Sequence, residues 1–439
     1  MSELVSDRLL IPVKSWTDEN GAFTWPAMPV VTSPRLTDKL PLEQLAQDLQ
    51  ARYGLKPCLE FRAGVPCSLW VTRDAGITNP EAYRIHITSD GIEITSSGDA
   101  GVYYAIQTLR EMIRCRRSAP SLPAVRIEDE PDFQRRGVYL DCARGKPPKV
   151  KTLKALVERL ASWKINEFQL YIKNGFKWNE HPDIGRGHSP YSPSDMLAVQ
   201  EHCKKHHIRF IPSLATLSHN ELTLQLPRYR HLAELPGAMG WEGGTMLCPT
   251  DPGSITLVEE LYREFLPLFE ADEVNVCCDE PWELGKGRSA DAAEKQGAGR
   301  VYLNFLLKVY ELCERFGKRM NMWGDIVLEH SELIPEFPKD VVMLNWDYAP
   351  HGKRMPRTSE FTNAGIPVVV CPGTQSWQRH GTDLPSAIAN VSNFAAIGRE
   401  NGALGLLNTD WGDFGHRNPL GVSLHGYAHG AAQAWHGAA

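Results

Sequence analysis

The sequence predicts an α/β protein in which a parallel (β/α)8 barrel, the TIM barrel, follows a small α/β domain. From about residue 135 onward, apolar strand-like runs alternate with stretches of helical spacing, and we count eight such runs. Repeated βα units imply a parallel sheet, and eight of them suggest a closed barrel. No glycine-rich phosphate loop follows the first run, which disfavours an open doubly wound sheet.

The small domain is predicted to occupy residues 1–131, and the barrel residues 132–439. The expected elements of the small domain are, in order, a helix at 42–53, strands at 83–87 and 91–95, and a helix at 100–114. Turn residues between the two strands predict a hairpin. Pro120, Pro123 and an acidic run at 128–130 mark the boundary between the domains.

The barrel elements follow from the same patterns of apolar residues. Strands are expected at 136–142, 167–172, 208–214, 273–278, 319–323, 341–346, 366–371 and 403–408. Helices are expected at 150–163, 193–206, 254–269 and 301–316. The helices between the last four strands are expected to be shorter.

The composition of the chain limits the classes of function that it can have. The 439 residues are 42% hydrophobic and 23% charged, as in soluble globular proteins. A formal net charge of −6 gives no electrostatic basis for nucleic acid or an anionic membrane as partner. No apolar run could span a bilayer. Residues 1–8 lack the pattern of a signal peptide, so we expect a cytoplasmic protein unless such a peptide was removed. The oligomeric state stays open, a homodimer included.

The ten cysteines include no C-x-x-C pair. Buried free thiols are the simplest interpretation, and neither a disulfide framework nor a zinc site is expected. His202, His206 and His207 have helical spacing, but lysines lie among them and no acidic ligand is in register. They are interpreted as a solvated helix face, so no metal and no cofactor are predicted.

Polar and aromatic residues follow the strands at the end where parallel barrels build active sites. The fourth strand ends in Asp279 and Glu280, and Pro281 is expected to hold Glu280 on an extended backbone. The other candidate residues are Arg144, His219, Trp323, Trp346, Tyr348, Trp377, Trp411 and Asp413. Aromatic faces stack on the C–H faces of a sugar, whose hydroxyls pair with Asp and Arg. This rim favours a carbohydrate site.

Two further features have more than one interpretation. Asp325 and Asp347 either bind hydroxyls or cap the short helices that follow them. The glycine-rich segment 285–288 lacks the Walker spacing and is expected to border the sugar site.

From about residue 83 the chain resembles glycoside hydrolase family 20, the β-N-acetylhexosaminidases. The motifs are Arg136-Gly137 with Asp141 and Arg144, Trp178-Asn179-Glu180, Thr216-Leu217-Ser218-His219, Asp279-Glu280 and Trp411-Gly412-Asp413. The N-terminal hairpin and helix resemble the small domain that precedes the barrel in this family.

The resemblance implies an exo-acting retaining enzyme that releases terminal N-acetylglucosamine or N-acetylgalactosamine. The 2-acetamido carbonyl of the substrate would attack the anomeric carbon and form an oxazolinium intermediate, an exception to the usual two-carboxylate scheme. Neighbours on a strand diverge, so Asp279 and Glu280 are poorly placed to flank one bond as acid and nucleophile.

The resemblance also assigns roles by position. Glu280 would be the acid and then the base, and Asp279 would orient the acetamido group. His219 would support Glu280 through a hydrogen bond, and Arg144 with Asp413 would hold ring hydroxyls. Trp323, Trp346 and Trp411 would form the walls of the pocket. Trp377 is a further candidate for this role.

Three departures from the family stand out. Lys173 and Asn174 replace acidic residues at the second strand end, and Cys277 and Cys278 replace glycines before the acidic pair. No tyrosine lies in 371–377, so Tyr348 is the candidate for contacting the acetamido oxygen. A cation near Glu280 would lower the pKa of that carboxyl. The alternative is that the side chains of Lys173 and Asn174 point away from the pocket and only shape the loop.

Two other functions compete with this one. A β-glycosidase could act on a sugar that lacks the acetamido group. A catalytically inactive carbohydrate-binding protein would keep the tryptophans but lose the acid. Because Asp279 and Glu280 are both present, the sequence disfavours the second alternative.

Overall fold

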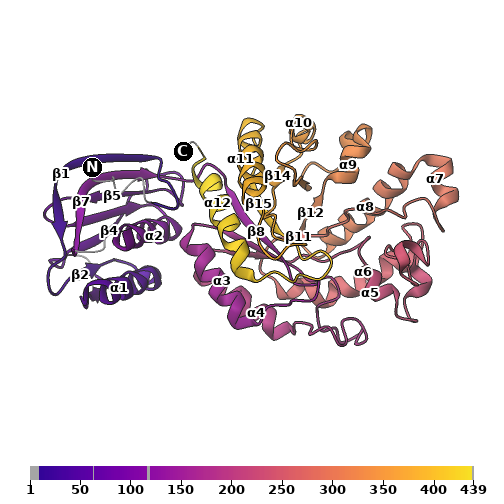
Figure 1. Cartoon of the computed structure of the whole chain (residues 1–439), viewed down its shortest axis with the longest axis horizontal. Coiled ribbons are helices and arrows are strands. Elements are labelled where there is room, and N and C mark those ends of the chain that lie inside the picture. Colours follow the sequence, from indigo (N-terminus) through magenta and orange to yellow (C-terminus); the bar gives the residue numbers. More distant parts are fainter. Residues whose placement is uncertain (1–8, 63, 116–118, 438–439) are drawn as a thin grey trace. The chain divides into compact units, whose positions relative to one another are not determined.

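The structure, a computed structural model, describes residues 9–62, 64–115 and 119–437 (Figure 1). The segment on which the signal-peptide expectation rests therefore lies outside the described residues. Two compact units are present. One is Met1–Gln134 with Arg159–Ile165 and Ala431–Ala439, and the other is Arg135–Glu158 with Asn166–Gly430. The predicted domain boundary after residue 131 stays a prediction.

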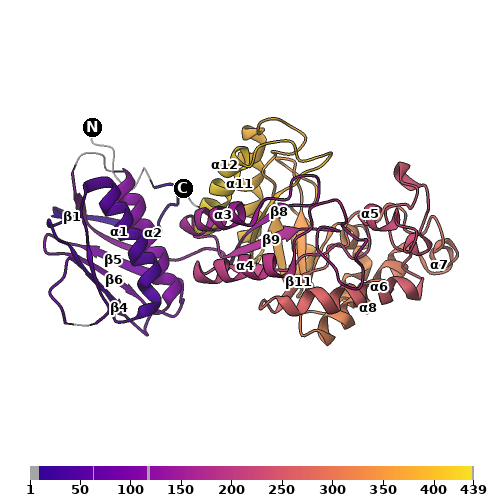
Figure 2. The same cartoon turned by 90° about the horizontal axis from the view of Figure 1, so that it is seen from below.

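The first unit is built on a seven-stranded mixed sheet with the order β1-β7-β5-β6-β4-β2-β3. Its strands are β1 (Ser15–Thr24), β2 (Val30–Thr32), β3 (Cys58–Glu60), β4 (Leu69–Arg73), β5 (Tyr83–Ile87), β6 (Ile92–Ser96) and β7 (Ser121–Asp129). Helices α1 (Lys39–Tyr53) and α2 (Asp99–Cys115) lie side by side along one face of it (Figure 2).

The predicted hairpin of β5 and β6 and both predicted helices are confirmed. The other five strands were not predicted. β1 is almost entirely exposed, so its sequence carries no alternation of apolar and polar residues. β2 and β3 have three residues each, too few for a periodic signal.

The second unit is the predicted (β/α)8 barrel. Its strands are β8 (Arg135–Asp141), β9 (Glu167–Tyr171), β10 (Arg209–Ile211), β11 (Glu273–Asn275), β12 (Arg319–Trp323), β13 (Val342–Trp346), β14 (Val368–Cys371) and β15 (Gly405–Asp410). They pair in parallel in the order β10-β9-β8-β15-β14-β13-β12-β11. Backbone bonds from Asn275 N to Pro212 O (2.9 Å) and from Leu214 N to Asn275 O (3.0 Å) close the barrel between β10 and β11.

Helices connect these strands (Figure 1). They are α3 (Val150–Ser162), α4 (Pro193–Lys205), α5 (Glu221–Leu224), α6 (Pro252–Phe265), α7 (Ala290–Gln296), α8 (Ala298–Arg315), α9 (Asp325–Glu329), α10 (Thr358–Asn363), α11 (Leu384–Glu400) and α12 (Leu424–Trp435). The expectation of short late helices holds for α9 and α10 but is wrong for α11, which has 17 residues. Its many small side chains give only a weak amphipathic pattern.

The two ends of the barrel interior differ in chemistry. At the start of the strands, buried Arg135 forms ion pairs with Glu167 (2.7 Å) and Glu273 (2.9 Å). Towards the ends of the strands the interior becomes aromatic, with Tyr139 and Trp323 5.2 Å apart between ring centres. The aromatic end therefore lies where the candidate site residues leave the sheet.

Two expectations about composition can be compared with the fold. All ten cysteines have free thiols, and seven of them are buried, as the interpretation of buried free thiols expects. Among the described helices, none combines the length and apolar character that crossing a membrane requires.

Candidate active site

The acidic pair lies on a left-handed turn. β11 ends at Asn275, three residues earlier than predicted, and Cys277, Cys278 and Glu280 have φ values of 61°, 64° and 48°. The expectation that Pro281 keeps Glu280 extended is therefore wrong. The expectation that the side chains of Asp279 and Glu280 diverge as on a strand is wrong for the same reason. L-residues rarely adopt this conformation, and such strain gathers at functional sites.

Both carboxylates face one imidazole. Nε2 of His219 lies 3.3 Å from Oδ2 of Asp279 and 3.7 Å from Oε2 of Glu280. His219 was predicted to support Glu280, but its shorter approach is to Asp279. His219 itself has a φ of 58°, so a left-handed residue after another strand also helps to bring the groups together.

Three hydrogen bonds hold the turn, two from residues that follow other strands and one from helix α8. The backbone N–H of Glu280 donates to Oδ2 of Asp325 at 3.1 Å, and Tyr302 donates to the carbonyl of Cys278 at 2.7 Å. The hydroxyl of Ser218 donates to the carbonyl of Asp279. The interpretation of Asp325 as a helix cap was wrong, because Gly324 precedes α9 as its cap and Asp325 instead fixes the backbone of the acid. No local sequence signal indicates a bond between residues so far apart. The interpretation of Asp325 as a hydroxyl-binding residue stays a prediction.

The pKa values of the pair are driven apart. Burial opposes ionisation of Asp279, but the charge and hydrogen bonding of His219 lower the pKa of Asp279 below its usual value. Burial raises the pKa of Glu280, and the charge of Asp279 raises it further. Burial, with the Asp279 charge, also raises the pKa of Asp325 to about 7. A pair of neighbouring carboxyl groups with one pKa lowered and the other raised suits acid–base chemistry.

An ion pair joins the segments that follow the first and last barrel strands. Arg144 Nη1 lies 2.7 Å from Oδ2 of Asp141 and 3.0 Å from Oδ1 of Asp413. The guanidinium also stacks over the rings of Tyr171 and Trp411, at 5.2 and 5.4 Å from their centroids. Buried Asp141 further accepts a bond from the backbone of Gly412 at 2.9 Å, which ties the two strand ends together.

These groups line a cavity of about 170 Å³. Its lining residues are Arg144, Asp279, Glu280, Trp323, Trp346, Tyr348, Trp411 and Asp413. Drug-sized ligands occupy pockets of about 300–1,000 Å³, so this cavity suits a single sugar ring. The structure brings together eight of the ten residues that the sequence singled out.

The other two residues lie behind the lining. His219 contacts the two carboxylates, as described above. Trp377 packs edge-on against Tyr348, with ring centroids 5.1 Å apart, and is not among the residues that line the cavity. Tyr348 in turn accepts a hydrogen bond from Nε1 of Trp411 at 2.6 Å, which fixes its hydroxyl at the cavity wall.

Lys173 does not act on Glu280 as a free cation. Its ammonium group is buried and forms an ion pair with Glu221, which follows the third strand. Asn174 is buried as well. The charge of Lys173 is therefore compensated by Glu221, and the predicted lowering of the pKa of Glu280 is wrong.

Other predicted roles change too. Both oxygens of Asp347 accept backbone bonds, from Ala349 at 3.2 Å and Arg354 at 2.9 Å, so it stabilises its own turn. The segment 285–288 is held by Glu234, which accepts from Gly287 N at 3.1 Å, and does not line the catalytic cavity.

Two groups of described residues bring possible metal ligands within 4.8 Å of one another. One is His219 with Asp279 and Glu280, and the other is Glu158 with His202 and His206. The sequence offered no acidic partner for His202, yet Glu158 of α3 lies 3.1 Å from its Nε2. In both groups a direct histidine–carboxylate pair accounts for the arrangement without an ion.

The chain matches two family models. Residues 133–386 match the model described as glycosyl hydrolase family 20, catalytic domain, and residues 10–130 match domain 2 of the same family. The chain belongs to glycoside hydrolase family 20. The catalytic match ends before Trp411 and Asp413, but the structure places both in the cavity with Asp279 and Glu280.

Curated relatives of this family 20 chain are distant. It is 24% identical over 314 residues to a β-hexosaminidase of Vibrio furnissii, covering 61% of this chain and 49% of the relative. It is 25% identical over 251 residues to human hexosaminidase D, covering 54% of this chain and 50% of the relative. The chain spans half or less of the length of the curated relatives it matches first.

Solved structures confirm the fold. An exo β-N-acetylglucosaminidase of Vibrio harveyi superposes with a TM-score of 0.77 at 18% identity, covering 98% of this chain and 74% of that one. An N-acetyl-β-hexosaminidase of Streptomyces plicatus gives a TM-score of 0.78 at 16% identity, covering 98% and 90%. The family 20 barrel and its preceding α/β domain are thus both present.

Proposed function

We propose that the chain is an exo-acting retaining β-N-acetylhexosaminidase that releases terminal N-acetylglucosamine or N-acetylgalactosamine by substrate-assisted catalysis. The observation that carries this proposal is the carboxylate of Asp279. Its Oδ1 atom is buried and accepts no hydrogen bond from any described residue. Leaving a buried acceptor unpaired costs about 1–3 kcal/mol. The N–H of a 2-acetamido group supplies the missing donor.

The first step is departure of the leaving group. Burial and the charge of Asp279 raise the pKa of Glu280, which favours its protonated form, and this form donates its proton to the glycosidic oxygen. As the bond from the anomeric carbon to that oxygen breaks, the carbonyl oxygen of the acetamido group forms a new bond to the same carbon. The product is a cyclic oxazolinium ion. Ionised Asp279 accepts the acetamido N–H and stabilises the positive charge that develops on the ring.

The second step regenerates the enzyme. Glu280, now a carboxylate, removes a proton from water, and the oxygen of that water attacks the anomeric carbon from the face that the leaving group vacated. The oxazolinium ring opens and restores the acetamido group. Two displacements at one carbon retain the β configuration.

The cavity walls account for recognition of the sugar. Arg144 and Asp413 are paired at 3.0 Å and offer donors and an acceptor to ring hydroxyls. Trp323, Trp346 and Trp411 provide apolar faces around the acetamido methyl group and the ring. The hydroxyl of Tyr348, already hydrogen-bonded to Trp411, is the group we assign to the acetamido oxygen.

The comparisons support the same activity. The relative from Vibrio furnissii is named a β-hexosaminidase, and the Vibrio harveyi structure is a complex with N-acetylglucosamine. The same findings support a carbohydrate as the binding partner. The cytoplasmic location and the oligomeric state stay predictions.

A panel of nitrophenyl glycosides tests the proposal. We expect turnover of the β-N-acetylglucosaminide or the β-N-acetylgalactosaminide and none of the plain β-glucoside. Turnover of the glucoside at a similar rate would favour a two-carboxylate β-glycosidase. Binding of the N-acetyl sugars without turnover of any substrate would favour a binding protein. The ratio of the two N-acetyl substrates assigns the sugar configuration.

A further inference from the structure

Three side chains from two helices meet outside the catalytic cavity. His202 lies in the last turn of α4, His206 directly follows that helix, and Glu158 belongs to α3. One possible ligand atom of each residue lies within 4.8 Å of those of the other two. None of the three residues lines the catalytic cavity, and the mechanism above uses none of them. The cluster is therefore open to another role.

The spacing of the two histidines places them on one side of α4. Residues four apart in a helix lie one above the other, and the ring centroids of His202 and His206 are 4.8 Å apart. A helix binds zinc through two histidines at this spacing. The sequence predicted only a solvated helix face, because no acidic ligand was in register. The fold supplies that ligand as Glu158 of α3, which spacing along α4 could not show.

A direct contact between Glu158 and His202 organises the cluster in advance. Oε1 of Glu158 lies 3.1 Å from Nε2 of His202, so this pair holds the two groups together without an ion. Ligand atoms at about 2.0–2.2 Å from a tetrahedral zinc ion are about 3.3–3.6 Å from one another. The three groups can reach this geometry by small side-chain rotations. The ion would replace the proton that lies between Glu158 and His202, and that proton would leave to solvent.

The surroundings of the cluster suit a divalent cation bound with modest affinity. His206 is 3% exposed, whereas the side chain of Glu158 is 55% exposed, so the open side admits water as a fourth ligand. Burial lowers the pKa of His202, although Glu158 opposes this shift, and the neutral imidazole is the form that binds metals. Lys154 and Lys205 also act on His202. Their positive charges oppose the binding of a dication, which limits its affinity.

We propose that Glu158, His202 and His206 bind a zinc ion that clamps the end of α4 to α3. Two imidazole nitrogens and one carboxylate oxygen are ligands that zinc prefers. Calcium and magnesium instead take sites built of oxygen atoms. This inference does not rest on the proposed function, because all three ligands lie outside the catalytic cavity.

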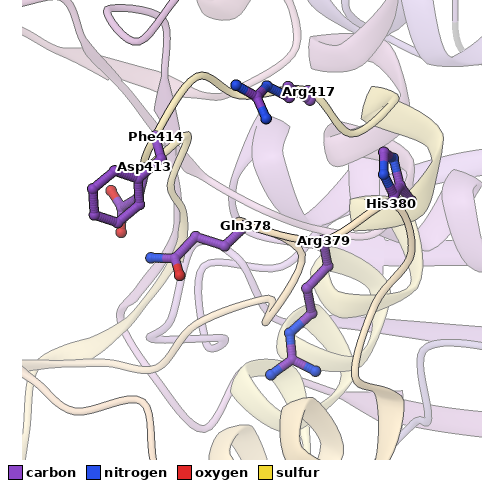
Figure 3. Close-up of a pocket in the computed structure, with 6 residues that line it drawn as sticks. All are labelled: Gln378, Arg379, His380, Asp413, Phe414 and Arg417. Atoms are coloured by element: carbon purple, nitrogen blue, oxygen red, sulfur yellow. The ribbon is translucent and has the colours of Figure 1, made fainter.

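A second cavity provides a control histidine for this proposal. The cavity is lined by Gln378, Arg379, His380, Asp413, Phe414 and Arg417 (Figure 3). The guanidinium groups of Arg379 and Arg417 point apart, and Asp413 lies on the opposite side of the view from His380 (Figure 3). Asp413 already pairs with Arg144 at 3.0 Å. His380 is exposed and belongs to neither group of possible metal ligands among the described residues. It is therefore the matched position for a histidine substitution.

Calorimetry of the full chain tests the zinc site. Cys58 is replaced by serine in every form, because an exposed thiol also binds zinc. We expect this parent to bind one zinc ion, and His202→Ala and Glu158→Gln each to weaken the binding at least about tenfold. His380→Ala should bind zinc as the parent does, and magnesium should not displace the ion. Zinc should also raise the Tm of the parent more than that of His202→Ala or Glu158→Gln.

Two further measurements separate this site from other zinc ligands in the chain. Cobalt(II) in place of zinc should give visible absorption bands without the near-ultraviolet band of a thiolate ligand, whose presence would assign the ion to a cysteine and overturn the inference. Loss of zinc binding in His219→Ala but not in His202→Ala would place the ion in the catalytic cavity, with the same consequence. So would absence of zinc binding by the parent, or unchanged affinity in both His202→Ala and Glu158→Gln. All these readouts are independent of glycoside turnover, so they leave the proposed function to its own test.

Discussion

The imidazole of His219 lies 3.3 Å from the carboxylate of Asp279, measured from Nε2 to Oδ2. This contact sets the chemistry of the whole pair. Burial opposes ionisation of Asp279, but the charge of His219 and its hydrogen bond to Asp279 lower the pKa of Asp279. The negative charge on Asp279 then adds to burial in raising the pKa of Glu280. The opposite pKa shifts of Asp279 and Glu280, and the groups that hold the two residues in place, can each be tested by substitution.

Replacing Glu280 by Gln should lower kcat about 100- to 10,000-fold on a substrate with a poor leaving group, because the proton donor is lost. Sugar binding should change little, since the cavity walls remain. Steady-state kinetics and calorimetry with the product sugar measure the two effects. Glu294→Gln, at an exposed position of α7, is the matched control. Near-normal turnover by the Glu280 variant would rule out its role as the acid.

Asp279→Ala should lose most of the affinity for a thiazoline analogue of the oxazolinium ion, because the charged acceptor of the ring N–H is gone. Affinity for the analogue would be measured by inhibition of the wild type and by calorimetry for both forms. Equal affinity for the two forms would contradict substrate assistance. So would a covalent glycosyl-enzyme trapped with a fluorosugar.

The pH dependence of kcat/KM should show the coupling between the two carboxyls. Glu280 acts in its protonated form, so activity falls as pH rises through the pKa of Glu280. Because burial and then Asp279 raise that pKa, the alkaline limb should lie above the usual range of a glutamate. Asp279→Asn removes the charge and should shift the limb of its residual activity to lower pH. A shift to higher pH would refute the coupling.

The buried pair of Lys173 and Glu221 should contribute to stability rather than to the pH profile. Lys173→Met leaves the Glu221 carboxylate buried without its cation, which costs about 3–5 kcal/mol. The double variant Lys173→Met with Glu221→Gln should recover much of the loss. Thermal unfolding measures both variants. Lys204→Met, which breaks an exposed pair with Glu270, should cause no measurable change.

The pH dependence of that loss has a definite sign. Burial opposes ionisation of Glu221, but the charge of Lys173 lowers the pKa of Glu221 below its usual value. The pair therefore stabilises the protein above the unfolded pKa of a glutamate, and this contribution disappears as pH falls through the folded pKa. The difference between the wild type and Lys173→Met should thus shrink in acid. A constant difference would contradict an ionic origin.

The stability of the protein should depend on whether a small or a branched residue occupies the left-handed turn before the catalytic pair. Cys278 has a φ of 64° and is fully buried. Cys278→Gly should keep stability near that of the wild type, because relief of backbone strain offsets the lost packing. Cys278→Val should be less stable than the glycine variant by about 1–3 kcal/mol. Cys313→Val, on the regular helix α8, is the matched substitution for thermal unfolding. Equal stability of the valine and glycine variants would refute the strain.

The sequence by itself determined the order of elements and the chemistry of the strand ends. Apolar runs of period two and helical stretches depend on neighbouring residues alone, so the eight barrel strands and helices such as α8 could be predicted. The acidic pair, Arg144 and the rim tryptophans were found because each lies at the end of a strand or within a few residues after it. Elements without a strong local pattern, such as exposed β1 and the alanine-rich α11, could not be found in this way.

The tertiary structure decided how these residues act on one another. The left-handed conformation of Glu280 depends on bonds from Asp325 and other strand ends, which no local pattern encodes. The sequence left open whether Lys173 acts on the acid or only shapes the loop, whereas the structure pairs its charge with Glu221 from a different strand end. Electrostatic energies depend on distance and burial rather than on sequence separation. For this reason the residues of the site follow from the sequence, while their protonation states and partners follow only from the fold.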